Sequence, residues 1–223
     1  MLQNIAIYPY ERDVFYREES DNCYSVEAFI LQYTTLEVPF EVVTSVIFGV
    51  MAAYAIDVQR SAKMALITAF NCFCIVSCGE SLGIMFCTLF DHVGFSVQIT
   101  SVLLSISIVM SGIMSLNIPD VLQAINYLSP IKYSVSNMAP YTMDGKTFTC
   151  SDAQRLPNGH CPLETGQQVL DLYNQHRDPD ISLMALGICA IVYRLIAYVL
   201  LRARRSKSAW ESIRMKLPAR RKS

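Results

Sequence analysis

Ionisable residues inside long apolar runs are the first candidates for chemistry in this sequence. Glu80 interrupts an apolar run about ten residues from its predicted inner end, between Gly79 and Gly83. In a lipid bilayer an ionised carboxylate needs a partner or a water-filled cavity, because hydrocarbon solvates charge poorly. The two small neighbours would let another helix approach closely and shield Glu80 from lipid. Glu80 is therefore a candidate functional group, and the alternative is a protonated or hydrogen-bonded carboxyl that only serves packing.

Three further charged residues lie at the ends of such runs. Glu37 and Glu41 are four residues apart and so share one helical face. They lie near the predicted inner boundary of the first run, where we expect them to pair or to reach water. Arg194 interrupts the last run between Tyr193 and Tyr198, and we expect it to snorkel to the interface.

The remaining residues of the sequence form no known catalytic motif. Histidine occurs only at His92, His160 and His176, which form no metal-binding motif. Gly145, Lys146 and Thr147 supply only the last part of a phosphate-binding loop, and Pro140 stands where the loop needs its earlier glycine. We therefore expect no enzyme activity, cofactor or metal in this chain, and no nucleic-acid partner.

The elements that must position these residues are long helices. The chain has 223 residues, of which 52% are hydrophobic and 17% charged, whereas soluble domains carry about 25% charge. A bilayer core about 30 Å thick needs about 20 helical residues. Four apolar runs are long enough, and they predict an all-α integral membrane protein with four transmembrane helices at 29–56, 64–90, 95–116 and 181–201. We assign 1–203 to the membrane domain and 204–223 to a basic tail.

The charge distribution orients these helices. Nine basic residues and one acidic residue follow Leu201, so the positive-inside rule places the tail in the cytoplasm. Four spans then put the N-terminal segment inside and the segment 117–180 outside. Residues 10–21 carry many charges with Phe15 and Tyr16 among them, which predicts an amphipathic helix at the inner surface. A solvated leader is the alternative.

The outer segment contains shorter amphipathic stretches. Residues 122–127 and 131–143 predict a re-entrant helix pair, and 166–177 predict a surface helix. Cys150 and Cys161 are the only cysteines on the outer, oxidising side, so they predict a disulfide. Two free thiols in a mobile loop are the alternative.

Several ordered strings resemble G-type ABC exporters, over essentially the whole chain. The stretch 11–18 (ERDVFYRE) and the stretch 36–40 (LEVPF) resemble the segment that follows the second membrane helix of that family. Ser111-Gly112, then Ile118-Pro119 and the Leu-Ser-Pro of 128–130, resemble the end of its fifth helix and its re-entrant outer loop. The fungal white-like half transporters and pleiotropic drug resistance transporters look most similar.

The resemblance implies a set of site residues and partners. In that family one nucleotide-binding domain joins six membrane helices, two such units form a transporter, and the complete protein uses ATP and Mg²⁺. This chain would start late in the second helix, as a fragment or as one piece of a longer polypeptide. The implied coupling helix contains Glu11, Phe15 and Glu18. The implied substrate cavity is lined by Gln98, Ser101, Val102, Ser105 and Ile108. Ile113 and Met114 occupy the positions at which members of the family close the outer end of this cavity.

The expected function is therefore the membrane part of an ATP-driven exporter of lipids or hydrophobic compounds. Its expected partners are the bilayer, a nucleotide-binding domain, a second transporter half and an amphiphilic substrate. We expect it in the plasma membrane or in an internal membrane such as that of the vacuole. A stand-alone four-helix channel or receptor in which Glu80 lines a pore, and a non-functional truncated copy, are the alternatives.

Overall fold

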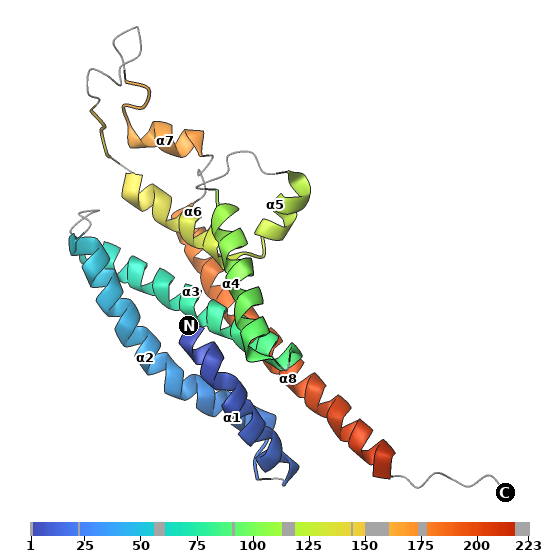
Figure 1. The fold of residues 1–223 in the computed structure, drawn as a ribbon. Coiled ribbons are helices and arrows are strands. Elements are labelled where there is room, and N and C mark those ends of the chain that lie inside the picture. Colours follow the sequence, from blue (N-terminus) through green and yellow to red (C-terminus); the bar gives the residue numbers. More distant parts are fainter. Residues whose placement is uncertain are drawn as a thin grey trace, which may run out of the picture. The chain divides into compact units, whose positions relative to one another are not determined.

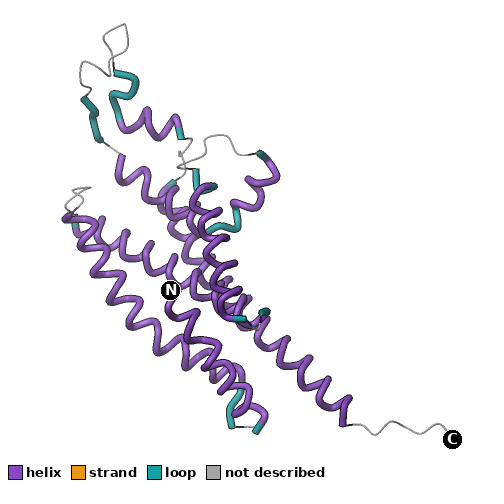
Figure 2. Tube along the Cα trace, viewed as in Figure 1, coloured by secondary structure: helices purple, strands orange, loops and turns teal. Residues whose placement is uncertain are grey.

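The described part of the chain is built from helices. The structure is a computed structural model that describes residues 2–21, 23–55, 61–90, 92–112, 119–143, 145–149, 161–173 and 178–216. Within these residues no β-strand occurs, and an isolated bridge between Thr147 and Thr165 is the only β-pairing (Figure 2). In chain order the helices are α1 (Leu2–Ser20), α2 (Val26–Ala55), α3 (Ala62–Leu89), α4 (Val93–Val109), α5 (Asp120–Asn126), α6 (Pro130–Met143), α7 (Gly166–Leu172) and α8 (Pro179–Lys216) (Figure 1).

Three of the four predicted spans are helices long and apolar enough to cross a membrane. They are Val26–Ala55, Ala62–Leu89 and Pro179–Arg205, with mean hydropathies of 1.7, 1.8 and 2.2. The run predicted over 95–116 corresponds to α4, which is apolar but has 17 residues, fewer than the roughly 20 that a bilayer requires. Residues 113–118 lie outside the described residues. The chain is thus an all-α, multi-pass membrane protein, and its fourth span stays a prediction.

Helix α8 extends beyond the span predicted over 181–201 and into the predicted tail. It has 38 residues and continues through the boundary at 203–204 to Lys216. Basic residues do not interrupt a helix, because lysine and arginine are good helix formers. Helix α7 is shorter than expected and ends at Leu172, and residues 174–177 lie outside the described residues.

The chain divides into two compact units. The first unit comprises Met1–Pro39, Ser77–Ser101 and Ile191–Ser223, and the second comprises Phe40–Val76 and Val102–Ala190. Each unit has its own buried polar and apolar contacts, and each is described by itself below.

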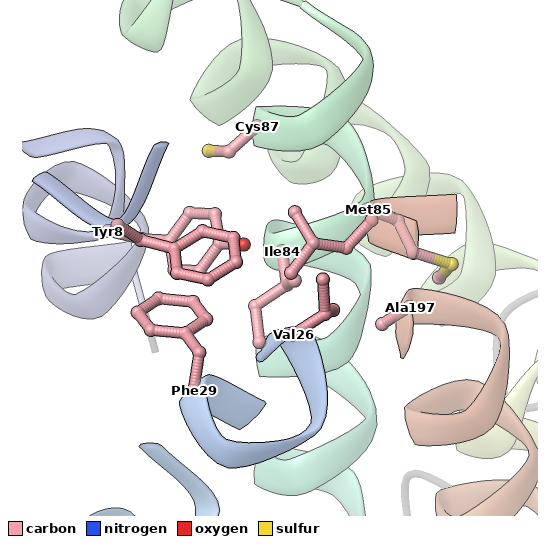
Figure 3. Packing of buried hydrophobic residues seen from close by; sticks show 9 residues of the cluster. Tyr8, Val26, Phe29, Ile84, Met85, Cys87 and Ala197 are labelled. Atoms are coloured by element: carbon pink, nitrogen blue, oxygen red, sulfur yellow. The ribbon is translucent and has the colours of Figure 1, made fainter. Parts of the chain in front are cut away.

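Aromatic packing forms the core of the first unit. The rings of Phe15 from α1 and Phe29 from α2 stack with centroids 4.4 Å apart, and Tyr8 meets Phe29 at 6.4 Å. Ile84 and Met85 of α3 join this cluster, as Figure 3 shows. Tyr8, Phe15 and the neighbouring Arg12 are buried at spacings of three and four residues, so one face of α1 packs into this unit. A helix is therefore present over 10–20, and it begins at Leu2. Its expected amphipathic pattern is not found, because the charged Arg12 is buried while Tyr10 and Val14 are exposed.

A close backbone approach and an amide network hold the second unit. A Cβ atom added at Gly49 of α2 would lie 2.6 Å from the carbonyl oxygen of Ala65 and 2.9 Å from the Cβ of Ala69, both on α3. Small residues at such a crossing are typical of membrane helices. Asn71 of α3 donates to the side-chain oxygen of Asn137 of α6 over 2.9 Å, and Asn137 donates to the Pro179 carbonyl over 2.6 Å.

Candidate functional site

A buried ionic cluster joins three long helices inside the first unit. Atom Nη2 of Arg194 on α8 lies 3.5 Å from a carboxylate oxygen of Glu37 on α2, and these side chains are only 17% and 14% exposed. The Nε atom of Arg194 donates to the hydroxyl of Thr34 over 3.1 Å. Arg194 therefore has partners within the protein, and its expected position at the membrane interface stays a prediction. The carboxylate of Glu37 on the neighbouring helix competes with water for the guanidinium of Arg194. Hydropathy alone does not reveal which residue of a neighbouring helix accepts from it.

Glu80 of α3 completes this cluster. Its carboxyl interacts electrostatically with that of Glu37, which also interacts with Tyr33. The guanidinium of Arg194 lies 5.8 Å from the centroid of the Tyr33 ring, within range of a cation–π interaction. Thr34 and Tyr33 lie three and four residues before Glu37, so both can contact the neighbours of Glu37 on one side of α2. We call Tyr33, Glu37, Glu80 and Arg194 the ionic cluster.

The two other expectations about intramembrane carboxylates have different outcomes. Glu80 is 3% exposed, and Gly79 and Gly83 beside it are buried, which agrees with a carboxyl shielded by neighbouring helices. Glu41 was expected to pair or to reach water, but it is 6% exposed and so does not reach solvent. One helical turn after Glu37, Glu41 belongs to the second unit, and it takes no part in the ionic cluster.

Polar contacts fix α1 within the first unit. The guanidinium of Arg12 donates to the carbonyl oxygen of Cys87 on α3, and it also pairs with Asp13 at 2.9 Å. Glu19 forms an ion pair with Arg205 near the basic end of α8. Because these side chains touch, α1 packs beside the basic end of α8, and the cytoplasmic placement of both stays a prediction.

The three residues of the implied coupling helix take two different positions. Glu11 and Glu18 are exposed on α1, and Glu18 accepts a hydrogen bond of 2.6 Å from the Tyr24 hydroxyl. Both acids line a cavity of about 390 Å³ between α1 and α2. Partial burial, and then the charge of Glu37, raise the pKa of Glu11. Phe15 is fully buried, so it anchors the helix and does not face outward.

The implied cavity residues lie along α4. Gln98, Val102, Ser105 and Ile108 are exposed, and Ser101 is half-buried. Ser101 donates to the carbonyl oxygen of Val97 over 2.9 Å, as hydroxyls in apolar helices commonly do. Gln98 and Ser101 belong to the first unit, and the other three belong to the second. The implied plug residues Ile113 and Met114 lie outside the described residues.

The structure describes one of the two cysteines that were predicted on the outer side, Cys161. Cys161 is disulfide-bonded, whereas Cys150 lies outside the described residues. The pairing of Cys150 with Cys161 therefore stays a prediction. In the described part of the chain Cys74, inside α3, is not disulfide-bonded.

Sequence reasoning missed the constellation as a whole. It singled out Glu37, Glu80 and Arg194 separately, without joining them. The available signal was their charge, because two acids and one base in apolar helices tend to pair with one another rather than to contact water. The asparagine pair Asn71 and Asn137 was missed too, although each amide lies in an apolar or amphipathic helix and must find a partner.

Comparison with known proteins agrees with this architecture. Three helices long and apolar enough to cross a membrane define a multi-pass helical membrane protein. The family model of the ABC-2 type transporter matches residues 1–140, and the chain belongs to this family.

Two relatives place the chain within longer proteins. It is 38% identical over 211 residues to an uncharacterised ABC transporter ATP-binding protein/permease of Saccharomyces cerevisiae, covering 94% of this chain and 16% of that protein. It is 20% identical over 203 residues to ABC transporter G family member 21 of Arabidopsis thaliana, covering 91% of this chain and 29% of that protein. The chain thus spans less than a third of the length of either relative.

Proposed function

We propose that this chain is the membrane-spanning part of a G-type ATP-driven exporter of lipids or other hydrophobic compounds. The match to the ABC-2 family over residues 1–140 carries the proposal. Similarity to an ATP-binding protein/permease and to a G family member supports the same class. In this proposal α4 is the remaining span, and the protein resides in the plasma membrane or in an internal membrane.

The position of α1 supports a coupling role. Its buried face is fixed by Phe15 and by the bond from Arg12 to the Cys87 carbonyl, while Glu11 and Glu18 stay exposed on the other side. A helix held this firmly transmits a push on its exposed face to α2 and α3. The partner that pushes is a nucleotide-binding domain, and a second transporter half completes the assembly.

Chemistry and transport are divided between parts of the complete protein. Phosphoryl transfer needs a phosphate-cradling loop, a metal ligand and a positioned water. We assign these to the nucleotide-binding domain, which would bind ATP and Mg²⁺, and we assign no catalysis to this chain. Closure of that domain would drive an amphiphile outward from a cavity beside the exposed face of α4 at Gln98, Val102 and Ile108.

Charge reversal on α1 tests this proposal in the complete polypeptide. Glu11→Lys should lower transport-linked ATP turnover and leave nucleotide binding unchanged. Asp21→Lys is the matched control, because Asp21 is an exposed acid just beyond the end of α1. An unaffected Glu11→Lys exporter would remove the coupling role. ATP turnover by the purified 223-residue chain above a membrane-only background would overturn the division of labour.

A further inference from the structure

The cavity between α1 and α2 is large enough for a small organic molecule. It has a volume of about 390 Å³, and all its lining residues belong to one part of the first unit, Met1–Pro39. On α1 the lining residues Glu11, Val14 and Glu18 are three and four residues apart, so they share one face of that helix. Pockets of about 300–1,000 Å³ are typical of small-molecule sites.

Aromatic rings form much of the wall of this cavity. Tyr10 of α1 lines it together with Tyr24, Phe29 and Tyr33. The last three rings are held in place by packing. Phe29 stacks on the buried Phe15 with centroids 4.4 Å apart, Tyr24 meets Phe15 at 5.7 Å, and Tyr33 meets Phe29 at 6.4 Å. The face of an aromatic ring attracts cations, and rings that are already fixed need little reordering when a ligand binds.

Two carboxylates add negative charge to the same wall. Glu11 and Glu18 both line the cavity and are exposed. The Tyr24 hydroxyl donates to Glu18 over 2.6 Å, which fixes this carboxylate and leaves it able to accept from further donors. None of the nine lining residues is basic. Arg12 of α1 donates to the carbonyl oxygen of Cys87 on α3, neither of which lines the cavity. The lining therefore complements a positive charge.

One cation of the protein already contacts this wall. The guanidinium of Arg194 lies 5.8 Å from the centroid of the Tyr33 ring, and it pairs with Glu37 at 3.5 Å. Glu37 does not line the cavity. Because Arg194 is paired with Glu37, it does not neutralise the two carboxylates of the lining.

The apolar lining residues define the rest of the ligand. Val14 and Leu36 both line the cavity and are exposed, so an apolar body lying against them would remove their surface from water. The cavity lies near Val26, where the apolar span of α2 begins. This is the level of a bilayer at which amphipathic groups collect. A headgroup that carries phosphate beside its ammonium fits less well, because the two acids repel phosphate and the lining offers no base.

We propose that the cavity between α1 and α2 binds an amphiphilic organic cation, that is, a substituted ammonium group on an apolar body without phosphate. The ammonium group lies between the aromatic rings and the carboxylates of Glu11 and Glu18, and the apolar body lies against Val14 and Leu36. This site is distinct from the cavity beside α4 that was assigned to export, and it does not rest on the proposed function.

Binding of decyltrimethylammonium to the complete polypeptide tests the site. Isothermal titration calorimetry in nanodiscs, below the critical micelle concentration and with empty nanodiscs subtracted, should detect binding of this probe. Decyl sulfate and decyl maltoside have the same alkyl chain without the positive charge, and they should bind much more weakly. The double variant Glu11→Gln with Glu18→Gln should weaken binding of the cation about tenfold, because each exposed charge contact contributes a factor of a few.

Two single variants separate a local site from a general effect of charge. Tyr10→Leu should weaken binding about threefold, as loss of an exposed cation–π contact does. Tyr10 is exposed, so its replacement removes no core packing. Asp21→Asn is the matched control, because it removes an exposed acid that does not line the cavity. It should leave the affinity unchanged.

Photolabelling of the wild type needs no variant to fold. A diazirine-bearing alkyltrimethylammonium should label α1 and the first turns of α2, as mapped by mass spectrometry of the peptides. A short-chain phosphatidylcholine in excess should not displace it. Displacement by this lipid would assign the cavity to a zwitterionic headgroup and overturn the proposed ligand class.

The remaining outcomes each decide. Labelling of α1 and the start of α2, together with weaker binding in the double variant and unchanged binding in Asp21→Asn, supports the proposal. Labelling confined to other helices, or an unchanged affinity in the double variant, overturns it. Absence of wild-type binding also overturns it, and would agree with a basic side chain of the nucleotide-binding domain filling the cavity. None of these measurements uses ATP turnover, so failure of the site leaves the exporter proposal untouched.

Discussion

Arg194 and Glu37 form an ion pair at 3.5 Å between α8 and α2 in which neither side chain is more than 17% exposed. The same two helices carry a second pair, Arg202 with Glu27, at 3.2 Å. Its side chains are 65% and 55% exposed. The first unit therefore contains a buried and an exposed version of one interaction, which differ mainly in contact with water.

Removing each arginine should give very different losses of stability. Arg194→Met leaves Glu37 buried without its countercharge, and breaking a buried pair in this way costs about 3–5 kcal/mol. Arg202→Met should change the stability little, because exposed ion pairs are screened by water. The melting temperatures of the two variants of the complete polypeptide in the same detergent measure this difference. Equal shifts would show that burial does not set the strength of these pairs.

Hydropathy predicted the long helices but not their rotation about their own axes. The runs at 29–56, 64–90 and 181–201 were found because length and apolar content suffice to recognise a span. The partner of Arg194 was not found, because a span that is apolar all round gives little signal for which face meets which neighbour. For that reason the pairing of Arg194 with Glu37 was not predicted, and Glu41, expected to pair or to reach water, lies buried.

The amide network of the second unit gives the next prediction. Asn137 is fully buried and joins Asn71 of α3 to the Pro179 carbonyl at the start of α8. Asn137→Leu should lower the free energy of unfolding by about 1–3 kcal/mol, because it deprives these groups of a buried hydrogen-bond partner.

Thermal unfolding of the complete polypeptide measures the loss at Asn137. Gln123→Leu on α5 is the control, because Gln123 is exposed and its replacement should change the melting temperature little. Asn137→Asp separates the two bonds, since it keeps the acceptor for Asn71 and removes the donor to Pro179. A variant Asn137→Leu as stable as the wild type would contradict a supporting role for the network.

The crossing at Gly49 predicts opposite effects for two glycine substitutions. Gly49→Ala places a Cβ atom 2.6 Å from the Ala65 carbonyl oxygen, so α2 and α3 must move apart, at a cost of about 1–3 kcal/mol. Gly94→Ala meets nothing within 4 Å and should be neutral or slightly stabilising, because alanine is the better helix former. The yield of monodisperse protein and its melting temperature report both. A Gly49→Ala protein that matches Gly94→Ala would show that the helices do not touch there.

Glu11 should lower the stability of the protein at neutral pH. Partial burial, and then the negative charge of Glu37, raise its pKa above the ordinary carboxyl value. The folded state then binds the proton more tightly than the unfolded chain does, so the favourable contribution is full below the unfolded pKa and is lost as pH rises through the folded one. Glu11→Gln should therefore melt at a higher temperature than the wild type at neutral pH, and the difference should shrink as the pH falls toward the ordinary carboxyl range.

The control for Glu11→Gln is Asp21→Asn, at an exposed acid beyond α1. A stabilisation by Glu11→Gln that is independent of pH would contradict the electrostatic cause. A more stable variant with weaker transport-linked ATP turnover would indicate that Glu11 is kept for its contact with a partner, since such residues commonly trade stability for function.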